Sequence, residues 1–464
     1  MTVLDVQAIV MAAGRGSRMN ELVSSIPKCL LPIGNKPMIY YPIHMLELAK
    51  FSEVLICVLE TQERSIRESL AGLFMNIKLD FFTIKEEEDL GTVDTLKSLN
   101  EKQKIKTDFL VISCDTLTNF PLVHLLNLFR VHDPTLAALI SPTDVIVDGS
   151  TPGKKGKPDL EKDLIGTDPV NKKRLVFFQS ELEFDEDVPL RIGALRKCSK
   201  IDLSNTCLDA HVYILKRWVL NFLKDRKKFK SIKGDLIPYL IDKQFDTQPS
   251  KPNGSTKHGQ EKTNLLDCVE TEPLMKILGS LDTLYVEKNS PTEIRKEYPD
   301  SLIKCIASIP KEDISIRCNT VTGYYEANKR LRAIYPNLNF DEKHESPLPP
   351  SNPSSTSGPP VRPIISDGCT IASSVKIGDR TSIKKSSIGS NCVIGEKVKI
   401  TNSVIMDDVK IQDGCVIQGS IICSKAIIGA NVEIKDCVVT ADYEVAETSL
   451  KFSNEVLPSM TTGF

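Results

Sequence analysis

Two glycines and an arginine follow the first apolar run of the chain, which spans residues 6–13. Because Gly14, Gly16 and Arg18 are so close in sequence, a turn after a strand would bring backbone N–H groups and a guanidinium together. This combination suits the binding of a phosphate group. The spacing lacks the third glycine of the dinucleotide-binding fingerprint. A tight turn without any ligand is therefore an equal alternative for this loop.

A carboxylate at the end of another apolar run is a second candidate for ligand binding. Asp115 ends the run 109–115, and further apolar runs cover residues 54–60 and 136–140. Apolar runs separated by helical stretches predict an α/β domain whose mostly parallel sheet is covered on both faces. Such sheets place ligands at the carboxyl ends of their strands. Asp115 is therefore a candidate metal ligand, and the alternative is a solvated residue at a strand end.

The carboxy-terminal part of the chain carries an aliphatic residue at every fifth or sixth position, fourteen times in succession. This period predicts a parallel β-helix whose triangular coils contain about three hexapeptide repeats each. Each inward aliphatic side chain contributes roughly 1.5–3 kcal/mol of burial, which offsets much of the entropy lost on ordering the segment. The repeated positions are Ile365, Ile371, Ile377, Ile383, Ile388, Ile394, Ile400, Ile405, Ile411, Ile417, Ile422, Ile428, Ile434 and Val439.

The glycine loop and the residues after it resemble the nucleotidyltransferase superfamily, which makes nucleotide sugars. In that superfamily a Gly-x-Gly-x-Arg loop precedes Pro-Lys-Pro-Leu-Leu-Pro, and residues 27–32 here read Pro-Lys-Cys-Leu-Leu-Pro. The resemblance implies that the arginine and lysine hold a triphosphate, a Gly-Thr pair approaches the nucleobase and an aspartate binds Mg²⁺. The residues that match these roles are Gly14, Gly16, Arg18, Lys28, Gly91, Thr92 and Asp115.

The sugar side of the superfamily site is incomplete in this sequence. Residues 175–181 are the nearest match to a Phe-Val-Glu-Lys-Pro segment, and no lysine occurs between Leu175 and Leu190. A superfamily glycine is replaced by His211, for which a packed or surface position is favoured over a catalytic one. The segment 314–319 lacks the second metal-binding aspartate, and Arg317 lies near its place. Because the loss of one positioned charge typically costs about 2.7–4 kcal/mol of transition-state stabilisation, these changes predict the loss of catalysis.

The phosphate loop, the incomplete sugar side and the hexapeptide repeats together resemble the noncatalytic subunits of eukaryotic translation initiation factor 2B. This implies a left-handed β-helix and a role in supporting GDP-to-GTP exchange on initiation factor 2. It implies direct pairing with the epsilon subunit, assembly with the beta, delta and alpha subunits, and no required cofactor. We also expect weak binding of a purine nucleotide with Mg²⁺ at the loop. The alternatives are an active guanylyltransferase of the mannose 1-phosphate type, a β-helix acyltransferase and a scaffold of another complex.

The bulk composition argues against nucleic-acid and membrane partners. The net charge is −2, so no overall basic field would attract nucleic acid. No apolar run is long enough to span a membrane, and Met1 to Val10 lacks the basic start of a signal peptide. The 13 cysteines include no Cys-x-x-Cys pair, which indicates buried reduced thiols. These features predict a cytosolic protein.

Changes in composition predict the domain boundaries. Polar stretches rich in Pro, Ser, Gly and Lys interrupt the apolar pattern, and the longest of them holds seven prolines. The polar stretch 149–157 is predicted as a surface loop. The predicted segments are a nucleotidyltransferase-like domain at 1–341 with a flexible insertion at 246–264, a linker at 342–363, the β-helix at 364–445 and a short tail at 446–464.

Overall fold

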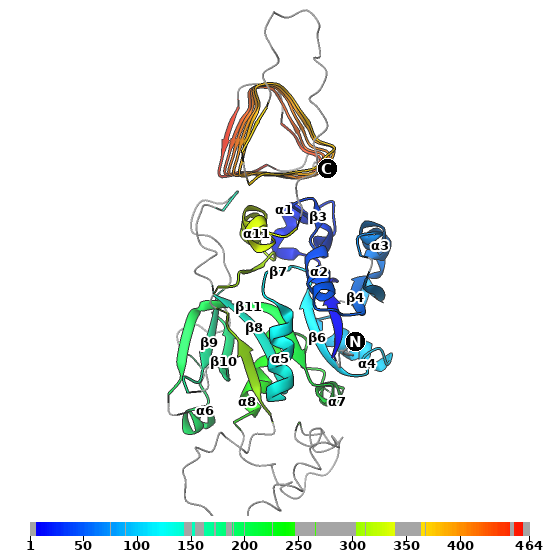
Figure 1. The fold of residues 1–464 in the computed structure, drawn as a ribbon, viewed down its shortest axis with the longest axis vertical. Helices are drawn as coiled ribbons and strands as arrows, with labels where there is room; N and C mark the ends of the chain where they lie inside the picture. The colour runs from blue at the N-terminus through cyan, green and yellow to red at the C-terminus, as the bar shows by residue number, and fades with distance from the viewer. Residues whose placement is uncertain are drawn as a thin grey trace, which may run out of the picture.

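The structure is a computed structural model that describes residues 6–142, 151–153, 162–181, 188–245, 265, 303–338 and 363–457, apart from residues 75, 89, 171–172, 189, 199, 225, 311, 367 and 446–449. These residues form an α/β part and a triangular coil, which lie at the bottom and top of Figure 1. The predicted insertion 246–264 lies outside the described residues, as does the predicted linker except Pro363. Among the residues described, no helix is long and apolar enough to cross a membrane.

The α/β part is built on a nine-stranded mixed sheet with a parallel centre. The parallel strands follow the order β6 (Asp108–Ser113), β1 (Val6–Met11), β4 (Glu53–Leu59) and β5 (Lys78–Ile84). The long strand β11 (Asp202–Leu215) makes the sheet mixed, because it runs antiparallel to β6, β8 and β9. The remaining strands are β8 (Leu136–Pro142), β9 (Asp163–Thr167), β10 (Leu175–Ser180) and β12 (Cys305–Ser308). The α/β class predicted from the apolar runs is confirmed.

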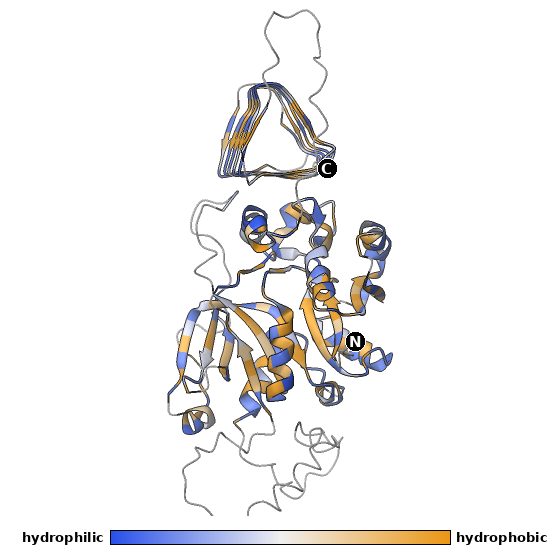
Figure 2. Ribbon diagram, in the orientation of Figure 1, coloured by the Kyte–Doolittle hydropathy of each residue, from blue (hydrophilic) through white to orange (hydrophobic). Residues whose placement is uncertain are grey.

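Helices cover both faces of this sheet, as the fully apolar strands predict. Alternate residues of the central strands point to opposite layers, so that Ile9 and Val111 pack with one set of helices and Val10 and Ile112 with the other. The central strands are accordingly hydrophobic throughout in Figure 2. The first layer contains α4 (Thr92–Glu101), α6 (Ile192–Lys197), α7 (Trp218–Leu223) and α8 (Ile237–Lys243), and the second contains α2 (Tyr40–Leu48), α3 (Glu63–Leu70) and α5 (Leu122–His132).

The hexapeptide repeats form a parallel β-helix with three sheets, seen end-on as a triangle in Figure 1. Equivalent residues of successive coils pair directly, as Ile383 does with Ile400 and Ile400 with Ile417. The strands are β14 (Ile364–Ile365), β15 (Thr370–Ile371), β16 (Lys376–Ile377), β17 (Ser382–Lys384), β18 (Ser387–Ile388), β19 (Val393–Ile394), β20 (Lys399–Thr401), β21 (Val404–Ile405), β22 (Lys410–Ile411), β23 (Val416–Gln418), β24 (Ile421–Ile422), β25 (Ile427–Ile428), β26 (Glu433–Lys435), β27 (Val438–Val439), β28 (Glu444–Val445), β29 (Lys451–Ser453) and β30 (Val456–Leu457).

The repeated aliphatic residues fill the interior of this coil. Thirteen of the fourteen are at most 6% exposed, which confirms their predicted inward position. Ile365 is the exception at 39% exposure, because β14 belongs to the first coil and no earlier coil covers it. The β-helix also extends beyond residue 445, since β29 and β30 pair with β26 and β27. The expected tail at 446–464 therefore includes part of another coil. The repeat did not predict this coil, because Phe452, which pairs with Ile434, is aromatic and lies one residue beyond the position that the spacing of the aliphatic residues predicts.

Glycines of the repeat allow adjacent coils to approach closely. A Cβ atom on Gly395 would lie 2.3 Å from Asp413 Oδ1 and 2.8 Å from Asp413 N. The same carboxylate oxygen accepts a hydrogen bond of 2.7 Å from Glu396 N. The left-handed corner positions are instead held by residues such as Arg380 and Asn391, with φ of 60° and 57°. Gly395 is therefore required by contact between coils, whereas Gly414 and Gly419 do hold left-handed positions, with φ of 72° and 60°.

One side of the triangle packs against the α/β part through a continuous hydrophobic cluster. Met19 and Tyr324 of the α/β part contact this cluster together with Met406 and Ile421 of the β-helix. Helix α11 (Val321–Ile334) adds polar contacts, and Tyr325 donates a hydrogen bond of 2.6 Å to Asn402 O. The two parts therefore share a core that local sequence patterns did not predict.

Thr151 and Pro152 of the predicted surface loop 149–157 are buried at this junction, and Gly153 is half-buried. The Thr151 hydroxyl lies 3.0 Å from Thr322 Oγ1 in α11, and Gly153 N donates a hydrogen bond of 2.8 Å to Asp436 O in the β-helix. Gly153 has φ of 79°, a left-handed conformation that glycine adopts without strain. The surface-loop prediction is wrong for Thr151–Gly153, because small side chains let this segment fit between the two parts. The rest of the loop lies outside the described residues.

Candidate functional site

The predicted glycine loop forms a tight turn after β1. It leads into the short helices η1 (Ser17–Met19) and α1 (Asn20–Val23), and Gly16 has φ of 73°. A Cβ atom on Gly16 would lie 3.3 Å from Lys28 Cβ, so the loop backs directly on the lysine. Gly14 has open space around its Cα, and the Arg18 side chain is exposed. Arg15, which the sequence did not single out, donates a hydrogen bond of 2.7 Å to Glu86 O of η4 (Glu86–Glu88).

Two residues predicted to bind different ligand groups contact each other. Lys28 begins η2 (Lys28–Leu30), and its ammonium forms an ion pair with Asp115 Oδ2. Asp115 lies between β6 and β7 (Thr116–Thr118) and is almost completely buried. Arg317, at the end of β13 (Ser315–Arg317), places Nη2 3.3 Å from the same Asp115 oxygen. We call Lys28, Asp115 and Arg317 the charge cluster.

The two cations keep the central carboxylate ionised. Burial alone would raise the pKa of Asp115, but the charges of Arg317 and Lys28 hold it well below its usual value. A Mg²⁺ ion prefers several oxygen ligands in near-octahedral geometry. Here an ammonium and a guanidinium occupy the surroundings of Asp115, and no group of three metal-ligating side chains occurs among the described residues. The residues present therefore do not fit a magnesium ion.

His211 stands where the superfamily has a glycine and adopts a left-handed backbone conformation. It lies at an irregularity of β11 with φ of 53°, and its N–H donates a hydrogen bond of 3.0 Å to Asp209 Oδ1. Its Nε2 lies 3.2 Å from Asp209 Oδ2. Burial, followed by the charges of Arg317 and Lys233, holds the pKa of His211 well below its usual value. A neutral, packed imidazole therefore fills space that a glycine would leave open.

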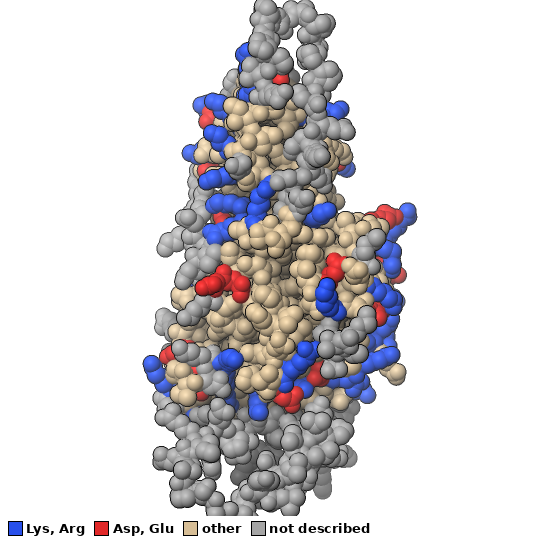
Figure 3. Space-filling model, in the orientation of Figure 1, with Lys and Arg blue, Asp and Glu red and all other residues tan. Residues whose placement is uncertain are grey.

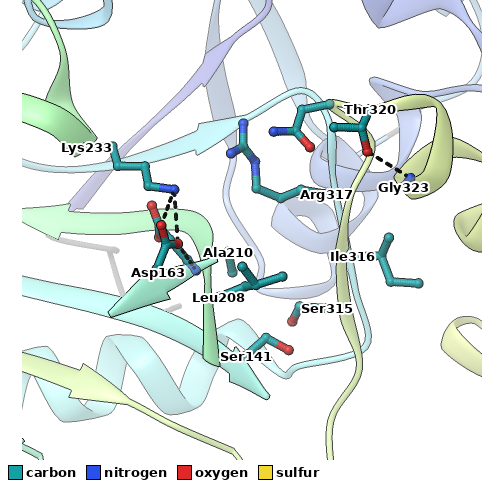
Figure 4. A pocket seen from close by; sticks show the side chains of 12 residues that line it. Ser141, Asp163, Leu208, Ala210, Lys233, Ser315, Ile316, Arg317, Thr320 and Gly323 are labelled. Atoms are coloured by element: carbon teal, nitrogen blue, oxygen red, sulfur yellow. Dashed lines mark hydrogen bonds and ion pairs between the residues drawn. The ribbon is translucent and has the colours of Figure 1, made fainter. Parts of the chain in front are cut away.

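A polar pocket beside the charge cluster contains a lysine that the sequence analysis missed. Figure 4 shows Lys233 of the π-helix η6 (Ile232–Leu236) facing Asp163 of β9, with Arg317 on the other side of the pocket. Lys233 Nζ lies 2.8 Å from Asp163 Oδ1. Burial raises the pKa of the neighbouring Asp209 to about 6, although Lys233 opposes the shift. No motif marks Lys233 or Asp163, because strands and helices far apart in sequence bring them together.

The predicted base-contacting pair is engaged with another segment of the chain. Gly91 precedes α4, and a Cβ atom there would lie 2.3 Å from Lys230 O. Thr92 Oγ1 accepts a hydrogen bond of 2.9 Å from Ile232 N. The structure therefore brings Gly16, Lys28 and Asp115 together, whereas Gly91 and Thr92 pack on residues 230–232.

The architecture and this pocket define a nucleotidyltransferase-like protein that carries a parallel β-helix. Family models agree with both parts. Residues 7–146 match the nucleotidyl transferase family, and residues 362–450 match the left-handed β-helix domain of the eIF2B epsilon subunit. The nucleotidyltransferase-like domain and the β-helix class expected from the motifs are therefore confirmed.

Among individual proteins, the chain is similar to gamma subunits of translation initiation factor eIF2B. It is 32% identical to the Schizosaccharomyces pombe protein over 52% of each chain. It is 29% identical to the Caenorhabditis elegans protein over 72% of this chain and 70% of the relative. It is 28% identical to the Dictyostelium discoideum protein over 85% of this chain and 89% of the relative. The chain thus spans about half the length of the first relative and more of the others. The resemblance to the factor 2B subunits is confirmed, with gamma as the matching type.

Proposed function

We propose that this chain is a noncatalytic subunit of a guanine nucleotide exchange complex acting on initiation factor 2. Its relatives are named as eIF2B gamma subunits, and an epsilon subunit also matches at 24% identity. The chain would support GDP-to-GTP exchange by the epsilon subunit in the cytosol. The single observation that carries the noncatalytic part of this proposal is the charge cluster.

The charge cluster leaves the remnant pocket without its reactive groups. Phosphoryl transfer depends on metal ions and cationic side chains that neutralise developing charge on the phosphates. In this chain Lys28 and Arg317 are both paired with Asp115, and Lys233 is paired with Asp163. A substrate phosphate would have to separate buried ion pairs before it could gain any of these cations. The pocket is therefore stabilised by its own charges, and we propose that the chain requires no cofactor.

A weak affinity for purine nucleotides is consistent with the same geometry. Gly14, Gly16 and Arg18 retain the turn that suits phosphates. Lys28, Gly91 and Thr92 contribute less, because all three have partners within the chain. Isothermal titration with GTP and Mg²⁺ at millimolar concentration tests this point, and the absence of any heat would leave the loop as a turn only.

The β-helix offers surfaces for the proposed partners. Its first strand exposes Ile364 and, among the described residues, has one unpaired edge. Two of the three sheets do not take part in the described cluster shared with the α/β part. Exposed edges and flat coil faces favour pairing with a similar chain. We therefore propose direct pairing with the epsilon subunit, and assembly through that pair with the beta, delta and alpha subunits and with initiation factor 2.

Release of labelled GDP from initiation factor 2 tests this function. Purified epsilon subunit is assayed alone and after mixing with this chain, and the mixture is run on a sizing column. We expect co-elution and faster release from the mixture. Equal release rates combined with separate elution would refute the proposal. Heat-unfolded chain serves as the control for nonspecific protein.

An active guanylyltransferase is the second candidate, because mannose-1-phosphate guanyltransferases are also similar to the chain. The Pichia angusta enzyme is 24% identical over 51% of this chain. The incomplete sugar side and the charge cluster argue against that activity, and a turnover assay with GTP and mannose 1-phosphate distinguishes the two.

A further inference from the structure

Lysine side chains project from the loop after α7, on a surface that the proposed function does not use. Helix α4 packs against α7, and Lys97 of α4 donates hydrogen bonds to the backbone of the loop after α7. The loop after α4 lies beside the start of α7, because Arg217 Nε donates a hydrogen bond of 3.3 Å to Ile105 O. Figure 3 shows Lys and Arg side chains gathered over α4 and α7. The exposed lysines of these loops, which we call the lysine surface, are Lys102, Lys106, Lys224, Lys227, Lys228 and Lys230.

The backbone of the loop after α7 is fixed from beneath. Lys97 of α4 donates hydrogen bonds of 2.9 Å to Arg226 O and 3.1 Å to Phe229 O. Asp235 Oδ2 accepts from Lys230 N at 2.8 Å and from Ser231 N at 2.7 Å. Because these contacts hold the main chain, the lysine tips are presented on an ordered surface. Binding at this loop would therefore cost less conformational entropy than binding at a loop that must first become ordered.

The charges of the lysine surface are not neutralised by the described part of the chain. None of its six lysines forms an ion pair with a described acidic residue. Nearby Lys216, by contrast, lies 3.0 Å from Asp108 Oδ2 and contacts Asp133. Clustered like charges repel one another and destabilise the compact state. An anionic partner would remove this repulsion.

We propose that the lysine surface docks an acidic segment of a protein partner, rich in Asp and Glu. The neighbouring aromatic rings are engaged internally, since Arg226 lies 4.9 Å from the Phe222 ring centre and Phe229 packs edge-on against Tyr239. No ring of this loop is therefore offered for stacking with nucleic-acid bases. The net charge of −2 also gives the whole chain no field that would gather nucleic acid.

Fluorescence anisotropy with the full chain tests this inference. The probes are a labelled oligoglutamate peptide and a labelled oligouridine of equal charge, at low and at physiological salt. The double variant Lys227→Glu/Lys228→Glu should weaken peptide binding about tenfold or more. The matched control, Lys384→Glu/Lys399→Glu, reverses two exposed lysines of the β-helix and should change affinity by less than about twofold.

Three results would overturn the proposal. They are the absence of peptide binding by the wild-type chain, equal losses in the two double variants, and tighter binding of the oligouridine that depends on Lys227 and Lys228. The last result would assign the surface to RNA. Circular dichroism of both variants shows whether each is folded. Lys227 and Lys228 lie outside the pocket and outside the β-helix, so a failure here leaves the proposed exchange function untouched.

Discussion

Replacement of Asp115 by asparagine isolates the contribution of the charge cluster. The amide keeps the shape of the side chain but leaves Lys28 and Arg317 without their counter-ion. Breaking a buried ion pair typically costs about 3–5 kcal/mol. The Lys28 and Arg317 side chains are 11% and 17% exposed, so water compensates in part, and we expect a loss of about 2–3 kcal/mol.

Urea unfolding followed by tryptophan fluorescence measures this loss. The single tryptophan, Trp218, is buried in the core of the α/β part and reports on the unfolding of that part. With a slope of about 3 kcal/mol per molar urea, the midpoint should fall by about 1 M. The control is Asp80→Asn, which breaks the exposed pair between Lys104 and Asp80 and should cost less than about 1 kcal/mol.

The difference in unfolding free energy between the wild-type chain and Asp115→Asn depends on pH, because the pKa of Asp115 is lowered in the folded state. A carboxylate with a lowered folded-state pKa stabilises the fold fully above its unfolded pKa of about 3.9 and loses that contribution as the pH falls toward the folded value. The deficit of Asp115→Asn should therefore be equal at neutral pH and near pH 5, and should shrink below about pH 4. A midpoint shift no larger than that of Asp80→Asn would refute the reasoning.

Three further predictions concern packing and thiol chemistry. Gly395→Ala should destabilise the β-helix by about 1–3 kcal/mol, measured by circular dichroism in urea, because the new methyl group would meet Asp413; an unchanged midpoint would contradict the close approach of coils. Gly153→Ala should lower the free energy of unfolding by about 1–2 kcal/mol, because alanine is strained in the left-handed conformation of this residue. Gly72→Ala is the control: Gly72 has a similar φ of 77° but open space around it, so any larger loss at Gly153 comes from contact with the β-helix. Burial raises the pKa of Cys29 and Cys423 to about 12, so iodoacetamide at pH 8 should label the half-buried Cys207 before them, as mass spectrometry of peptides can check.

The sequence predicts most of the β-helix and the centre of the sheet, because both depend on local periodicity. The hexapeptide spacing alone predicts that a residue such as Ile400 is buried. The uninterrupted apolar sequences of β1, β4 and β6 likewise predict that these strands are covered on both faces. The junction between the two parts is not predicted. Thr151 and Tyr324 reach it from distant segments, and no periodic pattern marks either residue.

The candidate site is predicted by residue type but not by arrangement. The motifs identify Lys28, Asp115 and Arg317, yet the sequence gives them separate tasks, whereas the fold joins them in one ion-paired cluster. Lys233 is absent from the prediction for the same physical reason. Its contact with Asp163 depends on how η6 packs beside β9 and β11, which only the tertiary structure determines.

Pyrophosphate release from GTP in the presence of mannose 1-phosphate and Mg²⁺ tests most directly whether the pocket has lost its chemistry. If Lys28, Arg317 and Lys233 stay in their ion pairs with Asp115 and Asp163 and do not bind substrate phosphates, the purified chain should release no pyrophosphate above a blank without protein. Release that increases with protein concentration and requires mannose 1-phosphate, at a rate above about 0.1 per second, only tenfold below the ordinary range for enzymes, would contradict the account.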